Sequence, residues 1–319
     1  MRLEAAEAFC PAHVTGFFKA HIVRDAAGLS DQMRTGSTGA GFSLAAGVTT
    51  RVVAGRGPDG APPQVVAAGR GGQTSLLRCV VKRFLRRAGV SGGVRLGITH
   101  KASVPAGCGL GSSGAAALSL AYALDGALGT GLAGEEIGRI AHAAEIDCGT
   151  GLGDVLASYH GGFEIRTVPG APGVGRVETI PAGGITAVVL CLAPVSTSRF
   201  LRERLPEING LGGAMTDRLR ASRDYGHFQS MSLEFAKSVG VVTPRMRGVI
   251  DELDAAGIGC GVALFGETIF CMVRAGSPEE EGALKIFGRH PEGVTVRSGL
   301  DEGGARLLRG CRGARAERS

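Results

Sequence analysis

The chain of 319 residues contains no tryptophan, and aromatic residues make up only 5% of its composition. Proteins that bind single-stranded nucleic acid stack bases on aromatic side chains, so this shortage argues against that function. The net charge of +6 comes from basic residues that are scattered along the chain, whereas nucleic-acid-binding surfaces usually cluster them. We therefore expect no nucleic-acid partner, and the positive charge either gives a mildly basic surface or attracts anionic substrates such as nucleotides and carboxylates.

The eight cysteines show no zinc-site pattern, because no Cys-x-x-Cys pair occurs and no histidine lies at ligand spacing. Most of them lie in apolar runs, where cysteine behaves as a small hydrophobic residue. The longest apolar run, around 185–195, is far shorter than the ~20 residues that span a membrane. The first residues lack the basic-then-apolar pattern of a secretory signal. These absences predict a reducing, cytoplasmic location without a membrane segment.

Glycine is the residue in excess, with 54 copies, roughly double its average share of ~7%. Many backbone positions must therefore form tight turns or approach other groups closely. The length allows two domains, at ~100–200 residues each. Hydrophobic periodicity predicts helices over 74–88, 113–128 and 133–146, and strands over 94–98, 161–167 and 185–193.

Capping signals mark two further helices in the last third of the chain. Thr243 is a candidate N-cap that precedes a proline at the first helical position, and Ser277 with Glu280 has the spacing of a capping box. A strand pair is predicted between these helices, over 259–265 and 268–273. This order of elements predicts an α+β architecture, with helices packed on largely antiparallel sheets.

The most informative segment runs from Val104 to Leu118 and has the sequence VPAGCGLGSSGAAAL. Its glycines allow the backbone to close around a ligand. A strand precedes the segment and a helix follows it, so that amide groups and the helix dipole favour an anion there. Ser112 and Ser113 add hydroxyl groups that could cap the helix or reach a phosphate or a metal. The segment therefore predicts a phosphate-binding loop.

This loop differs from two common phosphate-binding motifs. No lysine follows its glycines, as a P-loop requires. No clear acidic residue lies ~20 residues farther on at a strand end, as the dinucleotide-binding motif requires. An ordinary glycine-rich turn with a serine N-cap stays open as the alternative.

The pattern Pro-x-x-x-Gly-Leu-Gly-Ser-Ser before a small-residue helix resembles the second signature of the GHMP kinases, which phosphorylate alcohols such as galactose, homoserine and mevalonate. The residues that would bind the ATP phosphates by this resemblance are Pro105, Gly107, Gly109, Leu110, Gly111, Ser112 and Ser113. Segments 11–18, 36–42 and 144–155 are similar to archaeal pantoate kinases in particular. A weakened third signature would fall at Gly257–Gly261.

The resemblance implies an α+β, two-domain GHMP kinase fold. Residues 1–182 would form the ATP-binding N-terminal domain, which is ribosomal-protein-S5-domain-2-like. Residues 183–309 would form a ferredoxin-like α+β C-terminal domain. The last residues, 310–319, are expected to be a frayed tail.

The resemblance also implies ATP and Mg²⁺ as cofactors. Ser113 and Glu145 would bind the metal, in keeping with the oxygen ligands that Mg²⁺ prefers, and Asp154 would be the catalytic residue beside the acceptor hydroxyl. From the residues alone Asp154 could equally be a helix N-cap, and the two roles can coexist.

His13, Thr15 and Gly16 are candidates for substrate contact in the first signature. His13 stands where many GHMP kinases carry lysine, so we expect it to contact the substrate rather than a phosphate. A structural histidine is the alternative.

The implied reaction is ATP plus (R)-pantoate giving 4-phosphopantoate and ADP, an early step of coenzyme A synthesis in archaea. A carboxylate substrate calls for a cationic partner, and the sequence does not choose among Arg24, Arg51, Arg139 and Arg223. Several alternatives stay open: a kinase for homoserine or a mevalonate-like alcohol, a decarboxylase of the same fold, and a non-catalytic nucleotide-binding protein. A homodimer is also left open.

Overall fold

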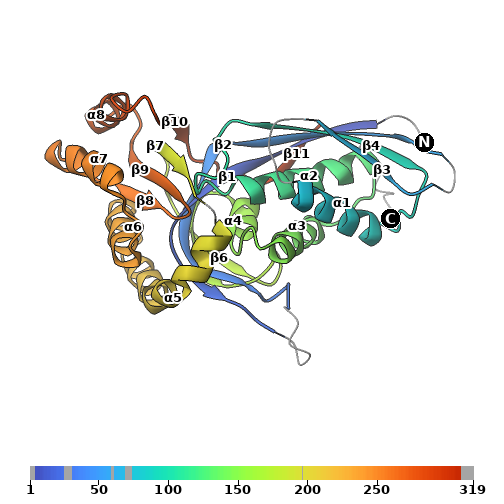
Figure 1. Ribbon diagram of the computed structural model, residues 1–319, viewed down its shortest axis with the longest axis horizontal. Helices are drawn as coiled ribbons and strands as arrows, with labels where there is room; N and C mark the ends of the chain where they lie inside the picture. The colour runs from blue at the N-terminus through green and yellow to red at the C-terminus, as the bar shows by residue number, and fades with distance from the viewer. Residues whose placement is uncertain (1–3, 25–30, 59–60, 69–73, 196, 310–319) are drawn as a thin grey trace, which may run out of the picture.

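The computed structural model describes residues 4–24, 31–58, 61–68, 74–195 and 197–309. The expected tail 310–319 and Cys311 lie outside these residues. The described chain folds into a seven-stranded sheet and a four-stranded sheet with helices packed on both, and Figure 1 shows the second sheet at one end of the first. The predicted α+β class is confirmed.

Two long strands dominate the first sheet, β1 (Glu4–His21) and β2 (Gly36–Arg56), which pair antiparallel along nearly their whole length. The sheet has the order β11-β1-β2-β4-β3, and β5 and β6 extend from the first half of β2. Its shorter strands are β3 (Gln64–Ala68), β4 (Val94–Ala102), β5 (Phe163–Val168), β6 (Arg176–Ile180) and β11 (Arg306–Arg309). Because β5 pairs with the half of β2 that lies beside residues 14–18 of β1, its side chains come close to β1.

The helices between β3 and β5 pack on one face of this sheet (Figure 1). They are α1 (Thr74–Arg87), α2 (Ser112–Leu128), α3 (Gly134–Cys148) and α4 (Asp154–His160). The central helix, α2, is rich in alanine and buried around most of its circumference. A helix that is apolar on all sides is stable only inside the protein, so this composition places the start of α2 in the interior.

The second sheet contains β7 (Ile185–Pro194), β8 (Gly261–Ala263), β9 (Gly266–Arg274) and β10 (Val294–Gly299). Its order β10-β7-β9-β8 is antiparallel throughout, which is the strand arrangement of the expected ferredoxin-like domain. The helices that accompany it are α5 (Thr197–Ser222), α6 (Tyr225–Val239), α7 (Pro244–Ala255) and α8 (Pro278–Phe287). None of the helices in the described residues is long and apolar enough to cross a membrane.

The elements predicted from periodicity are confirmed as α1, α2, α3, β4, β5, β7 and the β8–β9 pair. Thr243 caps α7 by accepting a hydrogen bond from the Met246 amide. The capping box at Ser277 is formed with one change, because the Glu280 carboxylate accepts from the amide of Gly276 rather than from that of Ser277. Helices α5 and α6 were not predicted.

The domain division stays a proposal, and β11 departs from it. This strand lies within the proposed C-terminal domain in sequence, but it pairs with β1 in the first sheet. The two sheets also share a phenylalanine cluster. Phe42 of β2 contacts Phe270 of β9, with ring centroids 5.2 Å apart, and Phe228 of α6 packs on both Phe163 and Phe270. Such pairs add about 0.5–1.5 kcal/mol each beyond the area they bury, so the junction between the sheets is a true core.

Candidate active site

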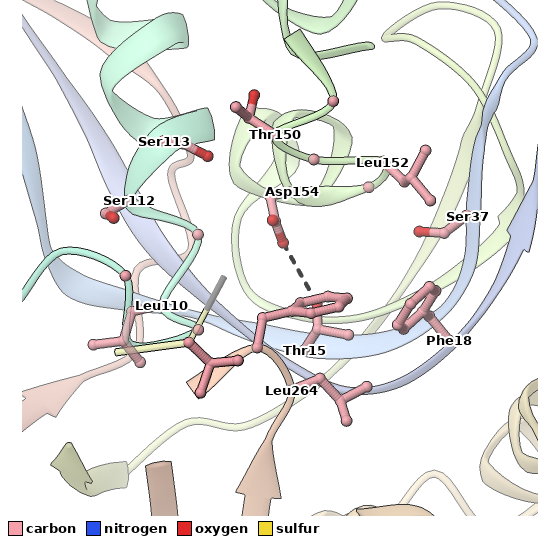
Figure 2. Close-up of a pocket in the computed structure, with 18 of the residues that line it drawn as sticks. Thr15, Phe18, Ser37, Leu110, Ser112, Ser113, Thr150, Leu152, Asp154 and Leu264 are labelled. Carbon is pink, nitrogen blue, oxygen red and sulfur yellow. Dashed lines mark hydrogen bonds between the residues drawn. The ribbon is translucent and has the colours of Figure 1, made fainter. Parts of the chain in front are cut away.

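A cavity of about 290 Å³ lies where this shared core reaches the phosphate-binding loop. It is lined by segments from β1, the loop before α2, the α3–α4 connection and the β8–β9 turn: Thr15, Phe18, Ser37, Gly107, Gly109, Leu110, Gly111, Ser112, Ser113, Cys148, Gly149, Thr150, Gly151, Leu152, Gly153, Asp154, Val195, Leu264 and Phe265. Figure 2 shows Asp154 between two walls, with Ser112 and Ser113 on one side and Ser37 and Phe18 on the other. The volume is at the low end for small-molecule pockets, which favours a compact ligand beside the loop.

The phosphate-binding loop depends on glycine at several positions. Three of its glycines have positive φ angles, which are 76° at Gly107, 71° at Gly109 and 57° at Gly111. Residues with a Cβ atom rarely adopt this conformation. At Gly109 a Cβ atom would also lie 2.2 Å from the carbonyl oxygen of Leu264, so the loop could not approach the β8–β9 turn this closely with any other residue.

The serine N-cap considered for this loop is not formed. Gly111 occupies the N-cap position of α2, and Ser112 is the first helical residue. The first amide groups of a helix have no partner within the helix, and here they belong to residues that line the cavity. This end of α2 can therefore receive an anion. Pro105 lies in the loop but is not among the described residues that line the cavity.

Ser113 and Glu145 are brought together as the resemblance implied. The Ser113 hydroxyl donates to Glu145 Oε1 at 2.7 Å, and the Thr150 hydroxyl donates to the same oxygen at 2.9 Å. Burial raises the pKa of Glu145 to about 7, and the nearby charge of Asp154 adds to this effect although the two hydroxyls oppose it. A Cβ atom at Gly151 would lie 2.2 Å from Glu145 Oε2, so glycine leaves this second oxygen open toward the cavity wall.

Asp154 is the first residue of α4, and Gly153 holds the N-cap position. The alternative of Asp154 as an N-cap is therefore wrong. Its carboxylate instead lies 3.2 Å from His13 Nδ1, and the Thr15 hydroxyl donates to it at 3.5 Å. Burial alone would raise the pKa of Asp154, but the bond to His13 and the charges of His13 and Arg166 outweigh burial and lower it.

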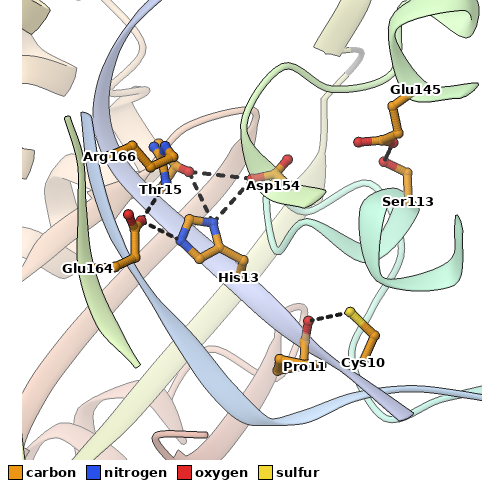
Figure 3. A network of polar contacts seen from close by, with 9 residues as sticks. All are labelled: Cys10, Pro11, His13, Thr15, Ser113, Glu145, Asp154, Glu164 and Arg166. Carbon is orange, nitrogen blue, oxygen red and sulfur yellow. Dashed lines mark hydrogen bonds and ion pairs between the residues drawn. The ribbon is translucent and has the colours of Figure 1, made fainter. Parts of the chain in front are cut away.

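His13 lies behind Asp154 and has no exposed side-chain surface. The prediction of direct substrate contact by His13 is therefore wrong. Its Nε2 is 3.0 Å from Glu164 Oε1, so the ring joins two carboxylates, as Figure 3 shows. Burial alone would lower the pKa of His13, but the bonds to Asp154 and Glu164 raise it above its ordinary value. A Cβ atom at Gly41 would lie 2.5 Å from Nε2, so glycine is required beside the ring.

Glu164 and Arg166 complete the network and were missed in the sequence. Both side chains are fully buried on β5, and the Arg166 guanidinium donates to Glu164. Arg166 Nε has no hydrogen-bond partner among the described residues and lies next to Gly153 of the cavity wall. Two opposite charges at alternate positions of an apolar strand were the available signal.

The four arginines named as partners for a carboxylate do not line this cavity in the described chain. Arg139 donates to Glu135 and to the Pro172 carbonyl oxygen, whereas Arg223 contacts Glu178 and the carbonyl oxygen of Thr179. The remaining two candidates, Arg24 and Arg51, are exposed.

A bulge in β1 decides which of its side chains enter the cavity. Relative to β2, the strand gains one residue between Thr15 and Phe17. The extra residue shifts the alternation, so that Thr15 and Phe18 both line the cavity. Gly16 itself faces α6, where a Cβ atom would lie 2.1 Å from Ser232 Oγ. The prediction of substrate contact by Gly16 is therefore wrong, since glycine there serves the packing of α6 on β1.

The expected third signature, Gly257–Gly261, precedes and begins β8 and is not among the described lining residues. The part of the second sheet that reaches the cavity is the following turn, Leu264–Phe265. The Leu264 amide donates to the Thr15 carbonyl oxygen at 3.1 Å, which ties this turn to β1.

Comparison of the sequence with known protein families finds one family that this chain resembles. Residues 75–162 match the family described as the GHMP kinases N terminal domain. The match spans the phosphate-binding loop, Ser113, Glu145 and Asp154. Residues 75–162 therefore resemble a GHMP kinase N-terminal domain, and the fold of the chain is shared with the solved phosphotransferase described below.

Two relatives extend the similarity over nearly the full length. A pantoate kinase from Methanocaldococcus jannaschii is 28% identical over 281 residues, which cover 88% of this chain and 96% of that protein. A pantoate kinase from Methanospirillum hungatei is 29% identical over 301 residues, which cover 90% and 93%. Among solved structures, a phosphotransferase related to the CoA biosynthesis pathway superposes with a TM-score of 0.81 at 22% identity, covering 95% of this chain and 98% of that one.

Proposed function

We propose that this protein is an ATP-dependent kinase that transfers a phosphoryl group to the 4-hydroxyl of pantoate, giving 4-phosphopantoate and ADP. The observation that carries the proposal is the position of Asp154 between the start of α2 and a separate wall that contains Ser37 and Phe18. Phosphoryl transfer requires the phosphate and the acceptor to meet in line at one point. The relatives named pantoate kinase support the choice of acceptor.

The ATP phosphates would lie on the glycine-rich loop and on the amides at the start of α2. Among the described residues, no group of three or more His, Cys, Asp or Glu side chains could hold a metal by itself. The pair of Ser113 and Glu145 nevertheless fits Mg²⁺, which commonly takes one or two protein oxygens and completes its shell with phosphates and water. Bound Mg²⁺ would neutralise charge on the transferring phosphoryl group.

Asp154 would accept a hydrogen bond from the acceptor hydroxyl and align it with the phosphate. A carboxylate whose pKa is lowered is a weak base, and a loose phosphoryl-transfer transition state places little demand on one. Orientation is therefore its main role. His13, whose two ring nitrogens face the carboxylates of Asp154 and Glu164, would help keep Asp154 ionised and would fix its position.

The carboxylate of the acceptor would bind toward Ser37, with Arg166 as the cation behind that wall. A Cβ atom at Gly153 would meet both Ser37 Oγ at 2.2 Å and Arg166 Nε at 3.1 Å, so the three groups are neighbours. A buried guanidinium attracts an anion more strongly than an exposed one because water screens it less.

The free thiols of the described cysteines support a reducing compartment, and we place the enzyme in the cytoplasm.

The test is ADP release by the purified protein with ATP and Mg²⁺ in the presence of pantoate, homoserine, mevalonate or galactose. We expect turnover with pantoate and only background hydrolysis with the others. Strong turnover with another alcohol would keep the kinase class and discard pantoate. ATP binding without turnover on any acceptor would discard the kinase itself.

A further inference from the structure

Phe265 occupies a backbone conformation that suits it poorly. It lies in the β8–β9 turn with a φ angle of 68°, in the left-handed region that a residue with a Cβ atom rarely adopts. The next residue is Gly266, which could adopt this angle freely but does not have a positive φ. Glycine is needed at 266 for another reason, because a Cβ atom there would lie 2.4 Å from the Cys108 backbone. Strain on a bulky residue at a pocket is an indication of function.

The ring of Phe265 lies against Phe18, with centroids 5.5 Å apart and an interplanar angle of 48°. Phe18 faces the cavity because the bulge at Gly16 shifts the register of β1 by one residue. If β1 paired regularly with β2 from Thr15 onward, Phe17 would lie in the place of Phe18. Two separate departures from regular backbone, a bulge in β1 of the first sheet and the strained β8–β9 turn of the second, thus bring two rings to one wall. Leu152 and Leu264 also line the cavity.

This apolar wall lies at the acceptor end of the cavity. In Figure 2, Phe18 lies beside Ser37, on the far side of Asp154 from Ser112 and Ser113. The nucleotide phosphates belong on the serine side, so a group that touches Phe18 while its hydroxyl reaches Asp154 must come from the acceptor. Pantoate carries two methyl groups on carbon 3, directly next to the carbon that bears the reacting hydroxyl.

We infer that Phe18 and Phe265 are specificity-determining residues that recognise the branched carbon of the acceptor and so select pantoate over unbranched hydroxy acids. The inference rests on the proposed function and adds to it the basis of acceptor choice. A hydrophobic pocket distinguishes substrates by about 10–200-fold for each methylene-sized group. Loss of one ring from the wall should therefore reduce, but not remove, the preference.

The experiment compares kcat/KM for pantoate with kcat/KM for 2,4-dihydroxybutanoate, which lacks the two methyl groups, in the wild type and in Phe265→Gly. Because two methyl groups are involved, we expect the wild type to prefer pantoate by about 100-fold or more, and the variant to lose about tenfold of that ratio through a higher KM for pantoate. The KM for ATP and the kcat/KM for the unbranched acid should change by less than the kcat/KM for pantoate, because neither ligand carries the two methyl groups. A ratio is insensitive to the fraction of folded enzyme, so partial unfolding cannot imitate the result.

Phe18→Leu tests the other ring and should lower the same ratio, whereas Phe265→Leu should retain most of it because an apolar side chain remains. An unchanged ratio in both Phe265→Gly and Phe18→Leu, with wild-type turnover of pantoate intact, would overturn the inference and leave the proposed function standing. In that case a lower melting temperature of the variants would assign the rings to packing alone. Absence of pantoate turnover in the wild type would overturn both proposals.

Discussion

Replacing Glu145 with glutamine should stabilise the protein in the absence of metal, and only above about pH 5. Folding raises the pKa of this buried carboxyl from its ordinary value of 4.5 to about 7. The folded protein therefore holds a proton that the unfolded chain releases, so the contribution of Glu145 to stability is largest below pH 4.5 and falls as the pH rises through 7. At 1.36 kcal/mol per pKa unit, the charged side chain costs about 3 kcal/mol at pH 8.

Glutamine keeps an oxygen that can accept from Ser113 and Thr150 but carries no charge at any pH. The assay is urea denaturation of both proteins with EDTA, at pH 5 and at pH 8. Groups far from residue 145 titrate alike in the two proteins, so the difference between the unfolding free energies reports Glu145 together with its charge interaction with Asp154. That difference should be below about 1 kcal/mol at pH 5 and about 3 kcal/mol in favour of the variant at pH 8.

Saturating Mg²⁺ and ADP should reverse the order at pH 8, because a bound cation offsets the charge of the wild-type carboxylate and stabilises only the protein that binds it. A difference that does not change with pH would refute the argument that burial holds Glu145 partly protonated. A stabilised variant that still uses Mg²⁺-ATP as the wild type does would remove Glu145 from the metal site while leaving the electrostatic argument intact.

Three further variants test separate parts of the site. Asp154→Asn should lower turnover by at least about 10²-fold while ATP binding, followed by calorimetry, is retained; comparable turnover would take Asp154 out of the mechanism. Gly109→Ala should lower the free energy of unfolding, measured by urea denaturation, by roughly 2 kcal/mol or more, and should also weaken nucleotide binding. The reason is that the new Cβ atom would lie 2.2 Å from the Leu264 carbonyl oxygen at a φ angle of 71°. No change in either quantity would mean that the loop can move away. Arg166→Met should lower the free energy of unfolding by about 3–5 kcal/mol, because it leaves Glu164 buried without its partner. The control is Arg139→Met, which removes a partly exposed arginine and should lower it by about 1 kcal/mol or less. Equal losses in the two variants would contradict the role of the buried pair.

The shape of the glycine-rich loop before α2 could be predicted from the sequence because its signals are local. Glycine spacing, the preceding strand and the small-residue helix all lie within a few residues, and these determine where amide groups point. Ser113, Glu145 and Asp154 were named by resemblance, and the structure places Ser113 on Glu145 and Asp154 beside Thr15. Helix caps at Thr243 and Ser277 were predictable for the same local reason.

The acceptor side was not predictable because it depends on contacts between distant strands. Arg166 follows an apolar strand pattern, and only the pairing of β5 with β2 places it behind Asp154. The four arginines named from the sequence have the same charge as Arg166, but none of them lines the cavity in the described chain. His13 was expected at the substrate because no local signal shows that Glu164 will close over its other side. The bulge at Gly16, likewise, is visible only against the register of β2.

The pairing of β11 with β1 has a consequence for how the chain is made on the ribosome. Strand β1 leaves the exit tunnel long before its outer neighbour, β11. The two strands can pair only when residues 306–309 have emerged. At about 5–20 residues per second, that edge stays open for tens of seconds of translation. Open edges invite pairing with other nascent chains, and Glu4 and Glu7, which are half-buried at the start of β1, are charges of the kind that discourage it. The same lag means that the first sheet, and the cavity wall that β1 contributes, is completed only after residues 306–309 have been synthesised.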